Sequence, residues 1–178
     1  MKSSCCIAGL LFITGCCCVA PANGQQQPYY ANWGVASLSH VSLGTFAPMD
    51  TPKGTSARAG YALSTGWAVA TDTWQFVTRI GYNQFSLRDQ SNGVTRGMDQ
   101  YNLMLELHSA RGTNDRMWLG PAVGLVHVRS GQSNHTGLAY GLSTGLSSGR
   151  LFMEARLIRG TVKEANGAVF TVGSYFPF

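Results

Sequence analysis

The chain is poor in charge, and its apolar residues form no long run beyond the N-terminal region. Only 12% of its 178 residues are charged, against roughly 25% in an ordinary soluble domain. All five cysteines lie before residue 19, and after residue 22 no window is apolar for long enough to make a membrane-spanning helix. The chain beyond the N-terminal region therefore excludes helical spans, disulfides and thiolate metal sites.

The N-terminal region is typical of a secretory signal. Lys2 provides a positive start, residues 5–19 are apolar and uncharged, and residues 20–22 (Ala-Pro-Ala) place small side chains where a signal peptidase inspects them. The apolar run is too short for a retained spanning helix. We therefore predict a cleaved signal peptide over residues 1–22 and a periplasmic lead-in over residues 23–34.

Glycine and aromatic residues are abundant. The chain has 22 glycines and 11% aromatic residues, while its mean hydropathy is close to zero. A membrane barrel combines these properties, because each strand turns only half of its residues toward lipid. The net charge of +5 falls to +4 without Lys2, and no basic run accompanies it. We therefore expect no nucleic-acid partner.

Turn signals divide residues 35–178 into eight segments, each long enough for a tilted strand that crosses a bilayer. The connections after the second, fourth and sixth segments are short, whereas those after the first and third are longer and polar. This alternation is typical of periplasmic turns and extracellular loops. We predict an all-β, eight-stranded antiparallel transmembrane β-barrel with an up-and-down meander. Its predicted strands are residues 35–47, 58–70, 74–87, 98–110, 116–129, 136–146, 150–162 and 168–178.

The last predicted strand has the clearest alternation. From Ala168 to Phe178, five of the six even positions are apolar, and the chain ends on an aromatic residue. This strand resembles the C-terminal strand of bacterial outer-membrane β-barrels, and the whole segment resembles the small eight-stranded family of the OmpA membrane domain and OmpX. The resemblance implies an outer-membrane location and an assembly signal at Phe176 and Phe178, read by the barrel-assembly machinery.

A barrel interpretation bears on how the N-terminus is processed. Residues 13–16, Ile-Thr-Gly-Cys, also resemble a lipobox, which would make Cys16 a lipidated N-terminus. A barrel held in the bilayer by its strands needs no lipid anchor. Cleavage before Asn23 is therefore the preferred prediction, and lipidation at Cys16 is the alternative.

Side-chain size alternates along the strands in a way that predicts which face meets lipid. In the predicted strand 58–70, large residues such as Tyr61, Leu63 and Trp67 alternate with glycine, alanine and serine, and the strand 136–146 repeats this pattern. Large residues outward and tiny ones inward suit a narrow eight-stranded barrel, whereas a lipocalin-like soluble barrel would show the reverse. The strand 35–47 is ambiguous, and we assign it no register.

The hairpin of strands 74–87 and 98–110 offers a sharper prediction. Asn92-Gly93 is the favoured pair for a two-residue type I′ turn. If it forms that turn, residues whose numbers sum to 185 lie opposite each other, so that Arg79 faces Glu106 and Ile80 faces Leu105. This register sorts apolar side chains outward and polar ones inward, and it extends the hairpin beyond the membrane.

Four charged residues, Arg79, Glu106, Glu154 and Arg156, fall on predicted inward positions at a similar depth. Buried charges are tolerated when they are paired, and the OmpA membrane domain, which the chain resembles in architecture, has an internal charge network. We interpret the four as a neutral core that plugs the lumen. The alternative is a gate that rearranges its ion pairs to pass small ions.

Histidines are the natural place to look for catalysis. Small outer-membrane barrels include lipid A deacylases with a His-x-Ser-Asn arrangement, and here Leu43 replaces the Asn after His40 and Ser42, while His127 has no Ser two residues on. A nucleophile needs a base within reach and an orienting group, and no such set is visible. We therefore predict no catalytic residues, and we also predict no cofactor and no metal site.

Basic residues gather toward the predicted outer end, where they could bind the phosphates of lipopolysaccharide; solvated loop charges are the alternative. We predict a monomeric, non-enzymatic surface protein whose partners are outer-membrane lipids and lipopolysaccharide. A narrow channel and a lipid A-modifying enzyme are the alternatives. The basic residues are Lys53, Arg58, Arg88, Arg96, Arg129, Arg159 and Lys163.

Overall fold

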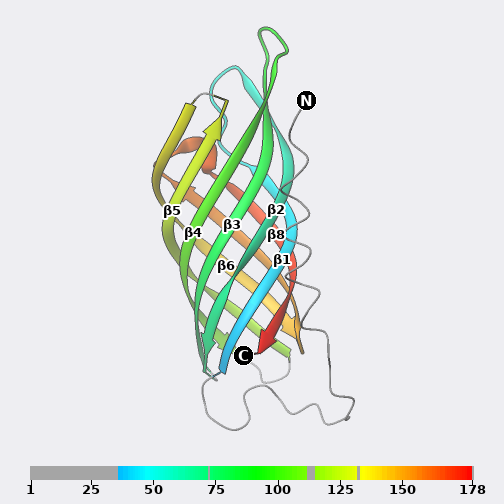
Figure 1. The fold of residues 1–178 in the computed structure, drawn as a ribbon, viewed down its shortest axis with the longest axis vertical. Helices are drawn as coiled ribbons and strands as arrows, with labels where there is room; N and C mark the ends of the chain where they lie inside the picture. Colours follow the sequence, from blue (N-terminus) through cyan, green and yellow to red (C-terminus); the bar gives the residue numbers. More distant parts are fainter. Residues whose placement is uncertain (1–35, 72, 112–114, 132, 178) are drawn as a thin grey trace, which may run out of the picture.

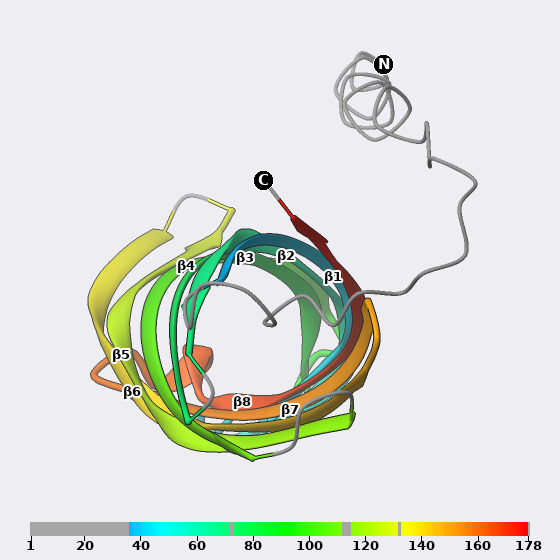
Figure 2. The ribbon, with the colours of Figure 1, turned by 90° about the horizontal axis from the view of Figure 1, so that it is seen from below.

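The structure is a computed structural model that describes residues 36–71, 73–111, 115–131 and 133–177. In these residues each strand pairs with its sequence neighbours, and β8 pairs with β1 to close the barrel, as the ring in Figure 2 shows. This confirms the predicted eight-stranded antiparallel meander. The elements are β1 (Ala36–Pro48), β2 (Thr55–Ala70), β3 (Trp74–Asp89), β4 (Thr95–Arg111), β5 (Asp115–Ser130), β6 (Ser133–Ser148), β7 (Leu151–Gly160), the 3-10 helix η1 (Lys163–Ala165) and β8 (Gly167–Pro177).

Several predictions fall outside the described residues. They are the signal peptide over residues 1–22, the lead-in over 23–34, the alternative lipidation at Cys16, and the terminal Phe178. Within the described ranges, no helix has the length and apolar character to cross a membrane.

The outer wall of the barrel is apolar along all eight strands, as the alternation predicts. Each strand exposes large apolar side chains on this wall, and hydrocarbon is the medium that such a surface matches. Some inward positions carry glycine because the neighbouring strand leaves no room there for a side chain. A Cβ added at Gly120 or Gly124 of β5 would lie 1.9 Å from a carbonyl oxygen of β4. One outward residue from each strand, in order, is Leu43, Trp67, Ile80, Leu105, Leu119, Leu142, Met153 and Val172.

The β3–β4 hairpin projects furthest at the outer end of the barrel (Figure 1), but its predicted register is wrong by two residues. Opposed residues sum to 183 rather than 185, so Ile80 lies opposite Leu103, and Arg79 lies opposite Met104 instead of Glu106. The turn is a four-residue loop from Gln90 to Gly93, closed by a hydrogen bond from the Asp89 N–H to the Val94 carbonyl. A shift of two residues keeps every side chain on its predicted face.

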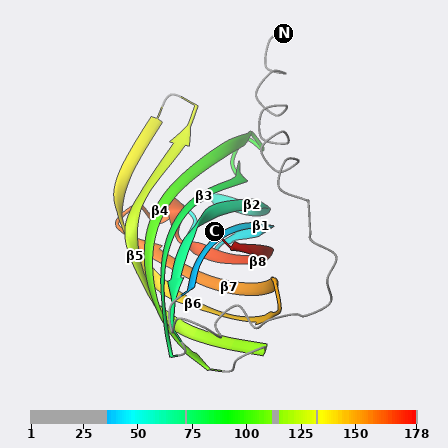
Figure 3. The same cartoon turned by 60° about the horizontal axis from the view of Figure 1, so that its bottom comes forward.

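The outer end is uneven in height. The β3–β4 and β5–β6 hairpins rise above η1, which follows the shorter β7 (Figures 1 and 3). The sequence predicts a strand over 150–162 and a loop over 130–135. In the structure β7 ends at Gly160, a 3-10 helix follows, and the chain between β5 and β6 shortens to residues 131–132.

Candidate functional site

Four charged side chains meet inside the barrel, and we refer to them as the ion cluster. Arg79 donates from Nε to Glu106 Oε1 at 2.8 Å and from Nη2 to Glu154 Oε2 at 2.6 Å. Arg156 Nε lies 2.6 Å from Glu154 Oε1, a charge contact whose orientation does not make a hydrogen bond. Arg79 and Glu106 are 2% and 1% exposed. The four formal charges cancel, which is the condition under which buried charges are tolerated.

The ion cluster is extended by neighbouring polar groups. Arg79 Nη1 donates to Ser64 Oγ at 3.1 Å, and Ser64 shares a second hydrogen bond with Ser42 at 2.6 Å. His108 Nε2 lies 2.9 Å from Glu106 Oε2. Because Arg79 lies opposite Met104 in the ladder, its side chain reaches Glu106 diagonally. The long guanidinium arm therefore makes the contact that the predicted register would have made directly.

An aromatic layer lies between the ion cluster and the end of the lumen that carries the short connections, the predicted periplasmic end. His108 stacks on Trp118 with 6.1 Å between ring centroids, and Trp118 meets Phe152 edge-on at 6.2 Å. Phe152 packs on Tyr175 at 4.7 Å and on His40 at 6.1 Å. These rings come from β1, β4, β5, β7 and β8, so they span the lumen below the charges.

An apolar layer lies on the other side of the ion cluster, toward the outer end. It contains Phe46 and Phe85, whose ring centroids are 5.0 Å apart, together with Met104, Val126 and Ile158. All five side chains are almost completely buried. The lumen is therefore layered, with rings at the end that carries the short connections and charges in the middle. Beneath the opposite mouth, aliphatic and phenyl groups lie beside the buried amides of Gln100 and Asn102.

Two ionisable residues of the described lumen, His40 and Arg116, escaped the sequence prediction. His40 is buried beside the ion cluster, but β1 distributes apolar residues over both faces, so its direction could not be read. Arg116 is buried near the end that carries the short connections, and its guanidinium donates to the Thr71 carbonyl across the barrel. Arg116 has the same parity as the inward Trp118, and this signal could have found it.

The predicted phosphate-binding residues fall into three groups. Arg58, Arg88, Arg129 and Arg159 lie on the outward face of their strands, as their cross-strand partners indicate. Lys53 and Lys163 lie on the connecting segments. Arg96 instead lies opposite the buried Leu87 and is directed into the mouth of the barrel. We call these seven residues the outer rim.

Few acids balance the outer rim. Among the described residues, Arg159 is the only one of the seven with an ion pair within 4 Å, to Asp50 at 2.6 Å. Asp99 accepts a hydrogen bond from the Tyr82 hydroxyl at 2.7 Å. Asp89 accepts from the Ser91 hydroxyl at 2.7 Å and from its backbone N–H at 2.8 Å, and these donors lower the pKa of that carboxyl.

The segment between β7 and β8, residues 161–166, is anchored in the mouth, and we call it the anchored segment. Asp50 Oδ2 accepts from Arg159 Nη1 at 2.6 Å and from Asn166 Nδ2 at 2.7 Å, while Asn166 Oδ1 accepts from the Gly160 N–H at 2.7 Å. Ala165 is completely buried against the apolar layer. The carboxylate of Glu164 is therefore held at the mouth by a fixed backbone.

A row of rings lies on the outward face beneath the outer rim. Tyr61, Tyr82, Tyr101 and His127 come from four adjacent strands, with 5.9, 5.1 and 6.3 Å between successive centroids. Amphipathic rings of this kind favour the interface between hydrocarbon and headgroups. At the other end, Phe176 is exposed on the outward face of β8.

The histidines form no catalytic set in the described part of the chain. His127 Nδ1 lies 2.8 Å from Thr136 Oγ1 on the outward face, but no carboxylate hydrogen-bonds to the His127 ring there. His135 lies in β6 rather than in the predicted loop. Over the described ranges, no group of three or more His, Cys, Asp or Glu side chains is arranged to hold a metal ion.

Comparisons with known proteins give matches of structure but not of sequence. No protein-family model and no curated protein matches the chain by sequence. The crystal structure of Neisserial surface protein A matches with a TM-score of 0.55 and 13% identity, covering 82% of this chain and 98% of that one. A second match is the crystal structure of Ail, the attachment invasion locus protein of Yersinia pestis, in complex with the heparin analogue sucrose octasulfate. It has a TM-score of 0.51 and 14% identity, and the match covers 80% of this chain and 97% of that one. Its backbone structure in a phospholipid nanodisc also has a TM-score of 0.51, with 16% identity and coverage of 79% and 99%. The chain therefore has the fold of the small eight-stranded outer-membrane β-barrels, the family that its sequence resembles.

Proposed function

We propose that the chain is a monomeric, non-enzymatic outer-membrane protein with a closed lumen, in which the outward-facing arginines of the outer rim bind the phosphates of lipopolysaccharide. The observation that carries the proposal is the position of four arginines on the outward face, just beyond the interfacial rings. A guanidinium binds phosphate as a bidentate fork. The apolar outer wall supports the location, because it matches a bilayer core.

Arg58 and Arg88 are the strongest candidates for a phosphate clamp. Arg58 lies opposite Ser86, so Arg88 is its diagonal neighbour on the same face, within the roughly 7–8 Å that separates such positions. Neither has an ion pair within 4 Å among the described residues, and both are exposed. The complex of Ail with sucrose octasulfate supports the proposal by analogy, because that ligand carries many anionic groups.

Binding to immobilised lipopolysaccharide would test this clamp. We expect the Arg58→Ala/Arg88→Ala variant to lose about tenfold in affinity, since hydrogen bonds to charged groups are the strong ones. Arg96→Ala is the matched control, because this arginine faces inward, and it should leave affinity unchanged. Lipopolysaccharide stripped of its phosphates should not distinguish the double variant from the wild type. Equal affinity of the double variant for intact lipopolysaccharide would instead mean that these arginines are simply solvated.

The closed lumen is proposed because side chains occupy three successive layers. The ion cluster cancels its own charge. Toward the outer end, bulky apolar side chains such as Phe46 and Phe85 occupy the lumen beside the buried amides of Gln100 and Asn102. Dry, apolar constrictions oppose ion passage. Planar-bilayer recording should therefore give little or no steady current.

A narrow channel is a second candidate, and a specific observation favours it. Buried polar atoms of His40, Gln100, Asn102, Ser143 and Thr171 make no hydrogen bond with the described residues. Groups of this kind require a partner, and water can serve. The same bilayer recording separates this candidate from the closed lumen.

The enzyme alternative has a direct test as well. A lipid A-modifying enzyme would change the acyl or headgroup pattern of the outer leaflet. We expect mass spectra of lipid A to be identical in cells with and without the protein. A consistent change in acyl pattern would point to the outward His127 and Thr136 and would replace the non-enzymatic proposal.

A further inference from the structure

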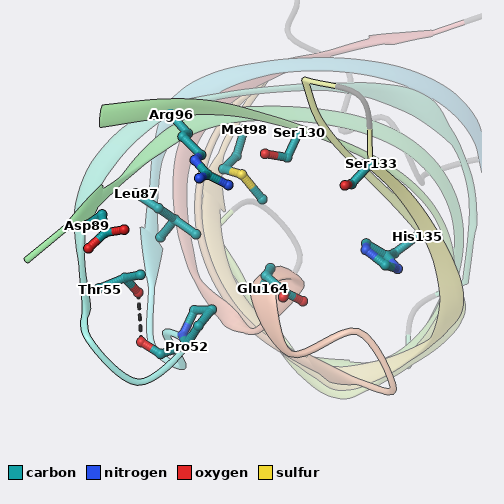
Figure 4. A pocket seen from close by; sticks show the side chains of 10 residues that line it. All are labelled: Pro52, Thr55, Leu87, Asp89, Arg96, Met98, Ser130, Ser133, His135 and Glu164. Carbon is teal, nitrogen blue, oxygen red and sulfur yellow. Dashed lines mark hydrogen bonds between the residues drawn. The ribbon is translucent and has the colours of Figure 1, made fainter. Parts of the chain in front are cut away.

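A pocket of about 270 Å³ opens at the outer mouth of the barrel. Its walls come from β3, β4, the β5–β6 hairpin and the anchored segment, with the loop before β2 on one side. Figure 4 shows Leu87, Arg96 and Met98 on one part of the mouth, His135 facing them, and Glu164 between. None of these positions belongs to the outward phosphate clamp.

The pocket is built on a fixed frame. Asp50 holds Arg159 and Asn166 together, and the buried Ala165 secures the anchored segment that carries Glu164. On the opposite side, Leu87 and Met98 are buried residues of the apolar layer and form the floor. A ligand would therefore meet groups already in place, which lowers the entropic cost of binding.

The charged side chains that line the pocket have opposite signs but form no ion pair with one another. Among the described residues, neither Glu164 nor Arg96 makes an ion pair within 4 Å. With the second acid, Asp89, the lining has two carboxylates and one guanidinium, so it is slightly acidic within a basic rim when His135 is neutral. A purely anionic ligand would meet repulsion from the two carboxylates, and a purely cationic one would meet repulsion from Arg96.

We propose that this pocket binds a small zwitterion with an apolar side chain. Its ammonium group lies at Glu164, its acidic group at Arg96, and its side chain on Leu87 and Met98. The volume lies at the lower limit of ligand pockets in general, which suits a molecule of amino-acid size. The proposal does not depend on binding of lipopolysaccharide, which uses the outward face.

Three matched probes test the proposal on the full barrel protein in detergent micelles. They are leucine, 3-methylbutylamine, which lacks the carboxylate, and 4-methylpentanoate, which lacks the ammonium group. We expect leucine to shift the amide NMR signals of Met98 and Glu164, with each truncated probe binding about tenfold more weakly, because each loses a charge-assisted hydrogen bond. Equal binding of all three probes, or no shift with leucine near its solubility limit, would overturn the proposal.

Substitutions in the pocket show which residue binds the ammonium group of the ligand and which binds its carboxylate. In Glu164→Gln, leucine and 4-methylpentanoate should bind alike, since the ammonium group no longer has its partner; in Arg96→Gln, leucine and 3-methylbutylamine should bind alike. Lys163→Gln and Arg88→Gln are controls of similar position outside the pocket lining, and both should retain the preference for leucine. Persistence of that preference in both lining variants would contradict the assignment. Heat-modifiable gel migration verifies that each variant is folded.

Discussion

The ion cluster and the outer rim use the same residue types in opposite ways. Inside the barrel, Arg79 and Arg156 are buried and matched by two glutamates. At the outer end, Arg58 and Arg88 are exposed and unmatched among the described residues. The comparison shows that a buried charge needs a partner of opposite sign, because water no longer solvates it. An exposed charge is solvated and stays available to a ligand. Stability should therefore depend on the inner set, and binding on the outer one.

The largest expected effect comes from unbalancing the ion cluster. Glu106→Gln removes the charge that Arg79 and His108 contact, and leaves a surplus of positive charge in the lumen. We expect the free energy of unfolding to fall by about 3–5 kcal/mol, the usual cost of breaking a buried pair. Urea unfolding in lipid vesicles measures it. Glu164→Gln at the mouth is the matched control, with an expected change below about 0.5 kcal/mol; similar losses for the two variants would erase the distinction between the regions.

Restoring neutrality should recover part of such a loss. Glu154→Leu alone leaves Arg156 without its nearest acid, whereas Glu154→Leu/Arg156→Leu removes both members of the 2.6 Å contact. Replacing a whole buried pair by apolar residues is often close to neutral, so we expect the double variant to be about 2 kcal/mol more stable than the single one. The same unfolding experiment measures it. Additive losses would mean that shape, not charge, limits this position.

The anchored segment should respond on an intermediate scale. Asp50 and Arg159 are 40% and 39% exposed at their side chains, so water screens their attraction. Asp50→Asn should lower stability by about 1 kcal/mol and should speed amide hydrogen exchange in residues 161–166 more than in β7. Uniform exchange across both would show that Asp50 does not hold this segment.

The smallest effect on stability is expected at the outer rim. Arg58→Gln/Arg88→Gln should change the free energy of unfolding by less than about 0.5 kcal/mol, while the affinity for lipopolysaccharide falls. Added salt should weaken wild-type binding but not stability, because exposed charges are screened. A marked loss of stability would place these two arginines with the structural charges instead.

Much of the fold was predictable because lipid imposes a period of two on each strand. Large residues such as Trp67 and Leu142 alternate with tiny ones, and this pattern identified strands and faces together. The facing of β1 could not be predicted because its large apolar residues lie on both faces. Leu38 and Phe46 face inward, while Val41 and Leu43 face outward. Its direction is set by pairing with β2 and β8, which the local pattern does not contain.

The turn between β3 and β4 illustrates why local signals mislead. Asn92-Gly93 favours a two-residue turn, but Asp89 and Asn92 accept hydrogen bonds from the backbone N–H groups of Ser91 and Val94, and this stabilises a wider loop. Gly93 supplies the required positive φ of 70° there. The residues of the ion cluster were still identified, because an even shift preserves each face.

The anchored segment at the mouth of the barrel could not be predicted. The anchored segment depends on Asp50, which is more than 100 positions away from Arg159 and Asn166 in sequence. Contacts of this kind have no periodic signature. The inward direction of Arg96 is different, because its even position in β4 matches that of the inward Met98 and Glu106 and holds in either hairpin register.

In our proposal, side chains close the lumen, so that ligands are bound only at the outer end. Recording the ionic current through single barrels in a planar bilayer tests this claim most directly. We predict an electrically silent membrane at moderate voltage, even when insertion is verified by heat-modifiable migration of the same preparation. A stable, ohmic current that increases with salt and falls when Phe46 is replaced by a larger tryptophan would contradict this, because it would place a continuous water path beside the ion cluster.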